Sequence, residues 1–183
     1  ASLAGGVGAT LTNGGETLHQ GVEVGVRADS AAFTGRLDNL FTRIAYTALP
    51  TATFTGVRYS AVAGSSAVPV TGNRLPYAPE HLLSWTLGYQ HPAGLDAQLE
   101  LVRVSAQFGD DLNTIVSSAD GQRGLIPAST LWNFAASWTL ARLHSSVFIT
   151  VKNVGDTLYI ADRSRGLLPG VPRLVQAGVR VRF

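Results

Sequence analysis

Apolar and polar residues alternate with a period of two along most of the chain. A period of two places successive side chains on opposite faces of a β-strand, so each such segment predicts a strand with one apolar and one polar face. Two weaker segments, residues 40–46 and the glycine-rich residues 3–11, extend the series. The clearest segments are residues 18–28, 83–90, 132–140, 146–152 and 175–183.

The segment Leu95–Phe108 changes its phase midway. Its apolar residues are odd-numbered up to Leu101 and even-numbered from Val102 onward. A β-bulge near Leu101 and Val102 restores a continuous apolar face, because one extra residue shifts the alternation by one position. Without that bulge, Arg103 faces the same side as Leu101. With this segment the sequence predicts about eight strands.

The connections between the predicted strands differ in length in a regular way. Short connections lie at residues 29–35, 91–94 and 142–145. The long ones run from about residue 49 to 76, from 109 to 129 and from 162 to 172. Short turns therefore gather at one end of the strands and long loops at the other. This asymmetry is typical of outer-membrane β-barrels.

Composition narrows the classes of protein. Only 14% of residues are Asp, Glu, Lys or Arg, whereas a soluble domain carries about 25%. No apolar run approaches the ~20 residues of a membrane-spanning helix, which excludes a helical membrane protein. The absence of cysteine excludes disulfides, thiolate zinc sites and cysteine nucleophiles. The net charge of +2 is spread along the chain and does not indicate nucleic-acid binding.

A transmembrane barrel fits these features better than a soluble β-sandwich, which also alternates apolar and polar residues. In hydrocarbon every backbone N–H and C=O must pair within the protein, and a closed barrel achieves this. An arginine facing lipid at mid-bilayer costs about 2–4 kcal/mol, so Arg180 and Arg182 are expected to face the lumen. The aromatic residues expected near strand ends, as in interfacial girdles, are Trp85, Tyr89, Trp132 and Trp138.

The last strand resembles the assembly signal of outer-membrane barrels. That signal has a polar residue, a glycine two positions later and hydrophobic residues up to a terminal aromatic, and here these are Gln176, Gly178, Val181 and Phe183. The resemblance implies recognition by the barrel-assembly machinery through strand pairing.

Four further stretches resemble TonB-dependent receptors of the ferric-siderophore transporter type. They are GETLHQGVEVGV at 15–26, GNRLPYAPEHLLSWTLGY at 72–89, VKNVGDTLYIADR at 151–163 and GLLPGVPRLVQAGVRVRF at 166–183. Each motif is weak by itself, but the four occur in the family's order and cover most of the chain.

The resemblance implies an all-β fold, an antiparallel transmembrane β-barrel. Family members have about 22 strands, a plug domain, a TonB-binding box and a signal peptide. Residues 1–183 are thus expected to be the C-terminal part of such a barrel, without those other parts. The implied function is import of a ferric siderophore or similar chelate, energised by TonB, across the outer membrane of a Gram-negative bacterium. Outer-membrane lipid is a further expected partner. The alternatives are a small outer-membrane barrel acting as an adhesin or structural protein, and a soluble lipocalin-like carrier.

Ligand contact is expected on the outer loops and upper lumen. Ferric siderophores are often anionic and carry planar chelating groups, which suit guanidinium and aromatic side chains. The candidates are Arg58, Tyr59, Arg74, Tyr77, Arg123, Arg163 and Arg165. A second set is expected to line the lumen or to touch the plug: Glu23, Arg27, Arg43, Glu100 and Lys152.

No catalytic, cofactor or metal site is predicted. The histidines His19, His81, His91 and His144 are far apart and lack metal-ligand spacing. Asp110, Asp111 and Asn113 suggest calcium, but the twelve-residue loop with its terminal Glu is missing. A solvated outer loop is the expectation there.

Overall fold

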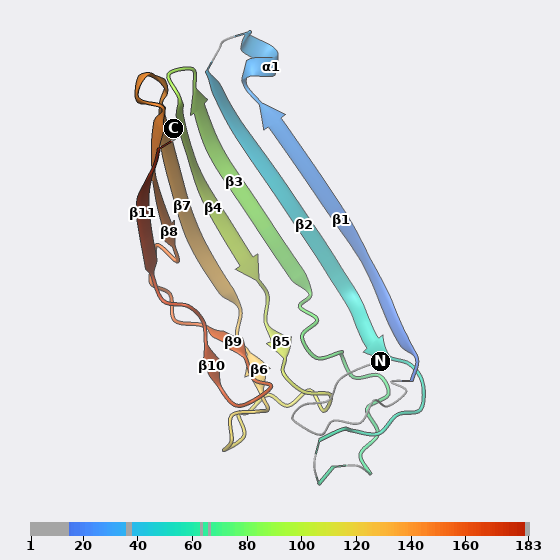
Figure 1. The fold of residues 1–183 in the computed structure, drawn as a ribbon. Helices are drawn as coiled ribbons and strands as arrows, with labels where there is room; N and C mark the ends of the chain where they lie inside the picture. The colour runs from blue at the N-terminus through green and yellow to red at the C-terminus, as the bar shows by residue number, and fades with distance from the viewer. Residues whose placement is uncertain (1–14, 36–37, 63, 66, 182–183) are drawn as a thin grey trace.

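The computed structural model describes residues 15–35, 38–62, 64–65 and 67–181. Seven antiparallel strands form one sheet, and each strand pairs with the next one along the chain among these seven (Figure 1). In order they are β1 Thr17–Asp29, β2 Asn39–Phe54, β3 His81–His91, β4 Leu95–Val104, β7 Ser129–Leu140, β8 Ser145–Lys152 and β11 Leu174–Val181. Within the described residues the sheet is open, with β1 and β11 as its edges.

Smaller elements lie in the connections. Two ribbons of two strands each belong to the long loops, and short helical turns lie at the opposite end of the sheet. The ribbons pair β5 Gln107–Phe108 with β6 Leu125–Ile126, and β9 Ile160–Asp162 with β10 Leu168–Pro169. The helical turns are α1 Ala31–Thr34 and η1 Ala141–Leu143. No described helix is long and apolar enough to cross a membrane.

The seven strands predicted within the described part are confirmed, and residues 3–11 and Phe183 lie outside it. Their bounds differ in two places. β2 continues to Phe54, well beyond the predicted end at Tyr46, and β4 ends at Val104, so Phe108 belongs to a separate ribbon. The short connections are confirmed, and the long ones all leave the opposite end (Figure 1).

The predicted bulge at Leu101 and Val102 is wrong. β4 pairs with β3 and with β7 from Leu95 to Val104 without any register shift. Arg103 therefore lies on the same face as Leu101. The one shift in the seven-stranded sheet is between β1 and β2, at Gln20 and Val22. Beyond the shift, the side chains of β2 alternate in the opposite phase, so each face of the strand carries residues of the other parity.

The register gives the sheet one apolar and one polar face. Residues directly opposite each other in an antiparallel pair lie on the same face, so each row across the strands can be followed. One row carries Val26, Ile44, Trp85, Leu101 and Trp132, and the next carries Arg27, Arg43, Thr86, Glu100 and Asn133. The odd-numbered residues of β8 and β11 continue the apolar face.

The side chains of the apolar face are not packed into a core. Val179 is 67% exposed and Ile149 39% exposed, and the aliphatic residues of β1 on this face are similarly open. The buried hydrophobic residues are Phe41, Ala52, Phe54, Val70 and Ile126. Ala52 and Phe54 lie at the end of β2, where the following loop folds back and pairs with it through Leu75 and Asn73.

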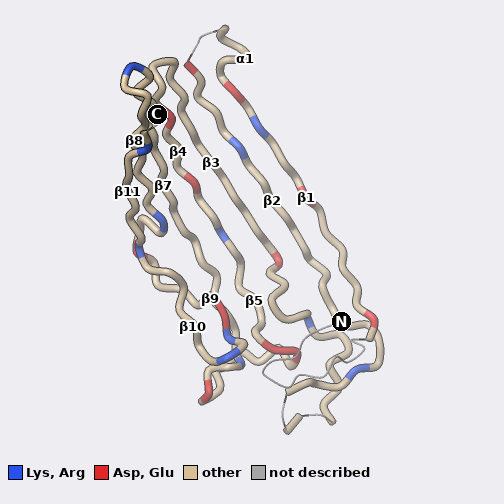
Figure 2. Tube along the Cα trace, in the orientation of Figure 1, with Lys and Arg blue, Asp and Glu red and all other residues tan. Residues whose placement is uncertain are grey.

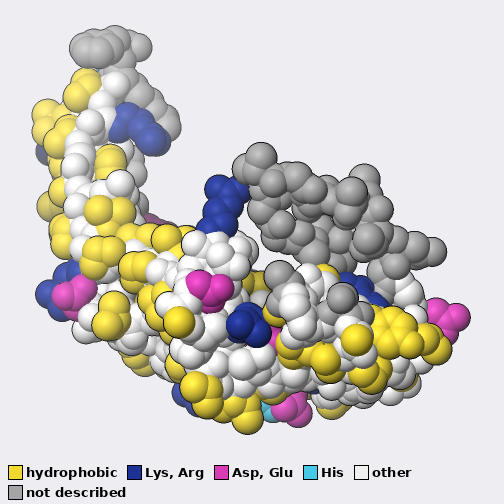
Figure 3. Space-filling view, turned by 90° about the horizontal axis from the view of Figure 1, so that it is seen from below, with side chains coloured by type: hydrophobic (Ala, Val, Ile, Leu, Met, Phe, Trp, Pro, Cys, Tyr) yellow, Lys and Arg dark blue, Asp and Glu magenta, His cyan; other side chains and the backbone are white. Residues whose placement is uncertain are grey.

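The sheet is curved, so one of its faces lies on the outside of the curve and the other on the inside (Figure 3). Seen from the loop end, the molecule is hollowed, with hydrophobic side chains on the outside of the left arm and Lys or Arg on its inner side (Figure 3). Charged residues are sparse along the strands (Figure 2). Tyr89 and Trp138 lie near the turn end, as predicted for a girdle, whereas Trp85 is in the middle of β3.

Two glycines on the polar face lie beneath aromatic rings of the neighbouring strand. A Cβ at Gly88 would be 2.2 Å from the Phe41 ring, and one at Gly178 would be 2.7 Å from the Phe148 ring. Phe148 breaks the polar alternation of β8, and its position over Gly178 accounts for this. The aromatic ring covers backbone that glycine leaves open.

Replacing Gly88 with alanine should destabilise the sheet. The added methyl group forces the buried Phe41 ring out of its position, and overpacking of this kind costs about 1–3 kcal/mol. Gly25→Ala is the matched control, because a Cβ there meets nothing within 4 Å. Thermal unfolding of the intact protein in detergent measures both. Equal midpoints for the two variants would contradict the packing described for Phe41.

Candidate ligand site at the outer loops

Three long segments leave the sheet at the same end (Figure 1). We call residues 55–80 loop A, residues 105–128 loop B and residues 153–173 loop C. Hydrogen bonds that involve polar side chains join each loop to the other two. These contacts make the three loops one connected structure.

Loop B is joined to loop A by Asp111 and Asn113. The Asp111 carboxylate accepts hydrogen bonds from the Ser60 hydroxyl and the Ala61 N–H, both at 2.7 Å. The Asn113 side chain accepts from the Arg74 N–H and donates to the Arg74 carbonyl, again both at 2.7 Å. Asn113 thus pairs with the backbone of loop A as a neighbouring strand would.

The expectation of a solvated loop at Asp110 and Asp111 is wrong. Both residues are only 6% exposed, because their carboxylates accept backbone N–H groups. Asp110 accepts from the N–H of Leu112, Thr114 and Gly124. Buried carboxylates are stable when their oxygens are bonded in this way. Within the described residues no group of three or more His, Asp or Glu side chains is arranged to hold a metal ion.

Loop A is joined to loop C by Tyr77. Its hydroxyl donates to Asp162 Oδ1 at 2.7 Å and accepts from the Arg163 N–H at 3.0 Å. Hydrogen bonds from Ser164 and then Tyr77 lower the pKa of Asp162 to about 2. Burial, followed by the bond to Asp162, raises the pKa of Tyr77. Because the pKa of Asp162 is lowered, its ionised carboxylate stabilises the fold at any pH above the ordinary pKa of 3.8. This stabilisation is lost as the pH falls from 3.8 towards 2.

Loop C is joined to loop B by Arg163, which is 2% exposed. Its guanidinium donates to the carbonyl oxygens of Gly121 at 3.0 Å and Arg123 at 3.2 Å, and to Ser117 Oγ at 2.9 Å. A longer bond of 3.4 Å reaches the Leu125 carbonyl. The acceptors are neutral oxygens, and the one salt bridge within the described residues joins Arg27 to Asp29 instead. The buried charge therefore depends on the folded shape of loop B.

The seven predicted ligand residues fall into two groups. Arg74, Tyr77 and Arg163 join loops or strand ends, and the Arg74 guanidinium donates to the carbonyl oxygens of Ala78, Leu49 and Pro50. The remaining four differ in their exposure. Arg58 lies 4.6 Å over the Phe54 ring, Tyr59 and Arg165 are exposed, and Arg123 is half-buried. The role of all seven in ligand binding stays a prediction.

The residues predicted to line the lumen share the polar face. Arg27 lies opposite Arg43, Arg43 lies opposite Thr86, and Thr86 lies opposite Glu100, so the four residues form one row. Glu100 accepts a hydrogen bond of 3.0 Å from Asn133 on β7. Lys152 follows on β8. Positive and negative side chains are thus present together on the inner face, which suits a wet surface.

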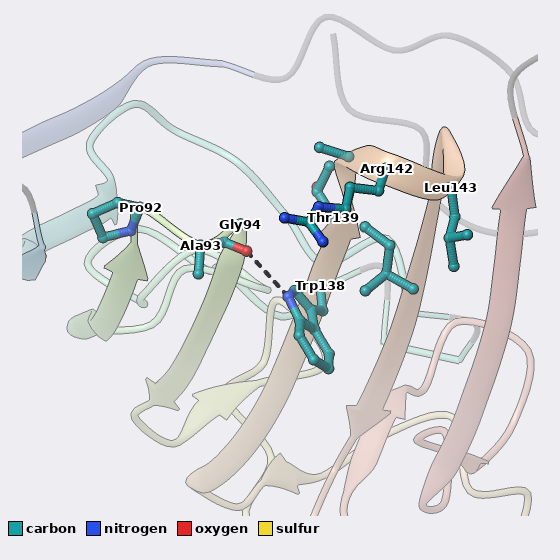
Figure 4. A pocket seen from close by; sticks show the side chains of 9 residues that line it. Pro92, Ala93, Gly94, Trp138, Thr139, Arg142 and Leu143 are labelled. Carbon is teal, nitrogen blue, oxygen red and sulfur yellow. Dashed lines mark hydrogen bonds between the residues drawn. The ribbon is translucent and has the colours of Figure 1, made fainter.

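A shallow pocket lies at the turn end of the sheet, opposite the loops (Figure 4). It occupies about 670 Å³ between residues 92–94 and 138–143. The Trp138 indole N–H donates to the Ala93 carbonyl at 3.1 Å and closes one side. Arg142 is the charged residue among its lining side chains. The pocket contains none of the seven predicted ligand residues.

Comparison with models of known protein families identifies the family of this chain. The model described as TonB dependent receptor-like, beta-barrel, matches residues 1–154. The chain belongs to this family. The sequence resemblance to TonB-dependent receptors is therefore confirmed over most of the chain.

Solved structures of three receptors are similar in fold to this chain. The chain is similar to the ferric citrate transporter FecA in its unliganded form, with 26% identity and a TM-score of 0.64 over 88% of this chain. The siderophore receptor PiuA from Acinetobacter baumannii gives 19% identity and a TM-score of 0.65 over 90%. The ferric-catecholate import receptor Fiu from K12 E. coli gives 19% and 0.56 over 78%. The chain spans 20–24% of these receptors.

Sequence reasoning singled out Tyr77 and Arg163 as ligand residues but missed their partners and the other residues that connect the loops. Asp111 and Asn113 were considered only as calcium ligands, and Asp162 was not singled out. The motif GDDLN was a usable signal, because Asp and Asn favour bonds to nearby backbone. Their partners in loop A lie 39 to 51 positions away in the sequence, so no local pattern reveals them.

Replacing Tyr77 with phenylalanine should loosen loop C of this TonB-dependent receptor chain. The change removes the hydrogen bonds to Asp162 and Arg163 and should lower the local stability of β9 by about 1–2 kcal/mol. Hydrogen exchange at residues 160–165 measures this loss directly. Tyr59→Phe is the control, since Tyr59 is an exposed tyrosine of loop A. The proposed joining role fails if both variants exchange like the wild type.

Proposed function

We propose that this chain is the C-terminal part of the barrel of an outer-membrane TonB-dependent receptor of a Gram-negative bacterium. The receptor imports a ferric siderophore or a similar metal chelate. This chain supplies part of the barrel wall and three outer loops. No chemical bond is changed by the barrel, which selects and admits the chelate.

One observation carries this proposal: the sheet has an exposed apolar face and a polar, charged face on opposite sides. An exposed apolar surface of this extent needs an apolar partner, and lipid hydrocarbon fits strands of this length. The family assignment supports the receptor class. The three similar solved receptors all take iron chelates or siderophores by their names, which supports the class of ligand.

Within the loops, four exposed or half-buried candidates are proposed to contact the chelate directly. Arg58, Tyr59, Arg123 and Arg165 provide guanidinium and aromatic groups that suit an anionic, planar ligand. Arg74, Tyr77 and Arg163 are proposed to act by holding the loops in position. A preorganised site of this kind reduces the ordering cost of binding.

Three partners follow from the proposal. TonB acts through the plug region, which lies outside this chain, and outer-membrane lipid surrounds the apolar face. The barrel-assembly machinery reads the last strand, where Gln176, Gly178 and Val181 belong to β11. The fourth residue of that signal, Phe183, lies outside the described residues.

Iron uptake by the intact receptor tests the proposed function. The receptor is produced in a Gram-negative strain that lacks its own siderophore receptors, and uptake of radioactive iron is followed with ferric citrate, a ferric catecholate and a ferric hydroxamate. At least one chelate should enter, and uptake should stop when TonB is absent. Uptake of none of them, or uptake that is independent of TonB, would contradict the proposal.

The same assay tests the exposed guanidinium of loop C. Arg165→Gln should weaken binding of the accepted anionic chelate by about 1–2 kcal/mol, because it removes a charge-assisted contact. Arg142→Gln, at the opposite end of the sheet, is the matched control. The surface level of each variant is measured by labelling intact cells. An unchanged affinity for Arg165→Gln removes this residue from the proposed site.

A further inference from the structure

Arg103 stands out on the apolar face. The continuous register of β4 places it in line with Leu95, Leu99 and Leu101. Among the described strand residues of this face, it is the one Asp, Glu, Lys or Arg. An isolated charge on a surface that otherwise suits hydrocarbon requires a partner.

The depth of Arg103 is set by its place in the strand. It is the ninth of the ten residues of β4, at the end where loop B begins. About 9–11 residues span the hydrocarbon layer in a tilted strand, so the guanidinium lies at the outer boundary of that layer. A lipid-facing arginine is far less costly at this level than at the bilayer centre.

The rows across the sheet contain more polar groups at this level. The row of Arg103 contains Tyr46, Leu83 and Thr130. The row towards the bilayer centre contains Trp85 and Trp132, whose rings meet edge to face at 6.2 Å. The Tyr46 hydroxyl and His81 Nδ1 are joined by a hydrogen bond of 2.9 Å. Polar groups therefore stand directly above two indole rings.

The Arg103 guanidinium has more N–H donors than its hydrogen bond to Thr130 uses. It donates to Thr130 Oγ1 at 3.1 Å, and its side chain is exposed. In the part of the chain that the structure describes, it forms no salt bridge with a carboxylate. A guanidinium has five N–H donors in a planar fork that matches two oxygens of a phosphate group.

We propose that Arg103 binds the phosphate group of an anionic lipid in the outer leaflet. Thr130 holds the guanidinium towards the headgroup level, and His81 lies on the same face of β3, two residues beyond Leu83, which pairs with Arg103. The acyl chains of the same lipid lie along Leu101, Trp85 and Trp132. This inference rests on the membrane position in the proposed function, but it is independent of which chelate is imported.

Lipid binding to the intact receptor tests this site. The purified receptor in detergent is titrated with bisphosphorylated lipid A and with the same lipid after removal of its phosphates, and bound lipid is counted by native mass spectrometry. Arg103→Gln should weaken binding of the phosphorylated lipid about tenfold, the loss expected for a charge-assisted pair. Binding of the dephosphorylated lipid should not change. Arg103→Lys should weaken binding less than Arg103→Gln, since the charge remains although the planar fork is lost.

Two controls show whether the effect belongs to Arg103 and to lipid. Arg142→Gln, at the opposite end, should bind phosphorylated lipid like the wild type, and millimolar inorganic phosphate should not displace the lipid. Heat-modifiable migration on gels confirms that each variant is folded. The proposal is overturned if Arg103→Gln binds like the wild type, if Arg103→Lys loses as much as Arg103→Gln, if Arg142→Gln loses as much, or if inorganic phosphate displaces the lipid.

Chelate binding measured on the same samples separates this proposal from the proposed function. Arg103→Gln should bind the accepted chelate with wild-type affinity, because the residue faces away from the lumen. A receptor that binds phosphorylated lipid through Arg103 but imports no iron chelate would refute the transport function alone.

Discussion

Backbone pairing in a medium without water is the constraint on which this structure depends. In hydrocarbon each unpaired N–H or C=O is costly, so the strands must pair along their length. Here β3, β4 and β7 pair without interruption on both sides. An unbroken register also keeps every second side chain on the same face. The apolar outside and the polar inside of the sheet are thus consequences of the same pairing.

The period-two pattern predicted the strands well, because each strand has one apolar and one polar face and carries that contrast in its own sequence. It was wrong at β4, where a bulge was predicted because the apolar residues change from odd to even positions after Leu101. The register is continuous, so Arg103 lies on the apolar face near its edge, where an arginine is tolerated. The extension of β2 to Phe54 was missed because, beyond the register shift, the strand pairs with loop A and its alternation changes phase.

The outer loops follow different physics from the sheet. Their structure depends on polar side chains, the buried Asp111 and Arg163 and the more exposed Tyr77, each bonded to a different loop. Such contacts join residues far apart in the sequence, so the residue types could be picked out but their roles could not. This arrangement suits the proposed function, in which guanidinium groups of the loops are held in position for a ligand.

The central claim is that the apolar face contacts lipid and the other face contacts water. Single cysteines bearing a spin label, placed along β8 of the intact receptor in a bilayer, test it most directly, since this chain has no cysteine of its own. Labels at 147, 149 and 151 should be relaxed by oxygen, which concentrates in lipid, and labels at 146, 148 and 150 by a water-soluble nickel complex. Equal accessibility at neighbouring positions, or the reverse alternation, would contradict the account.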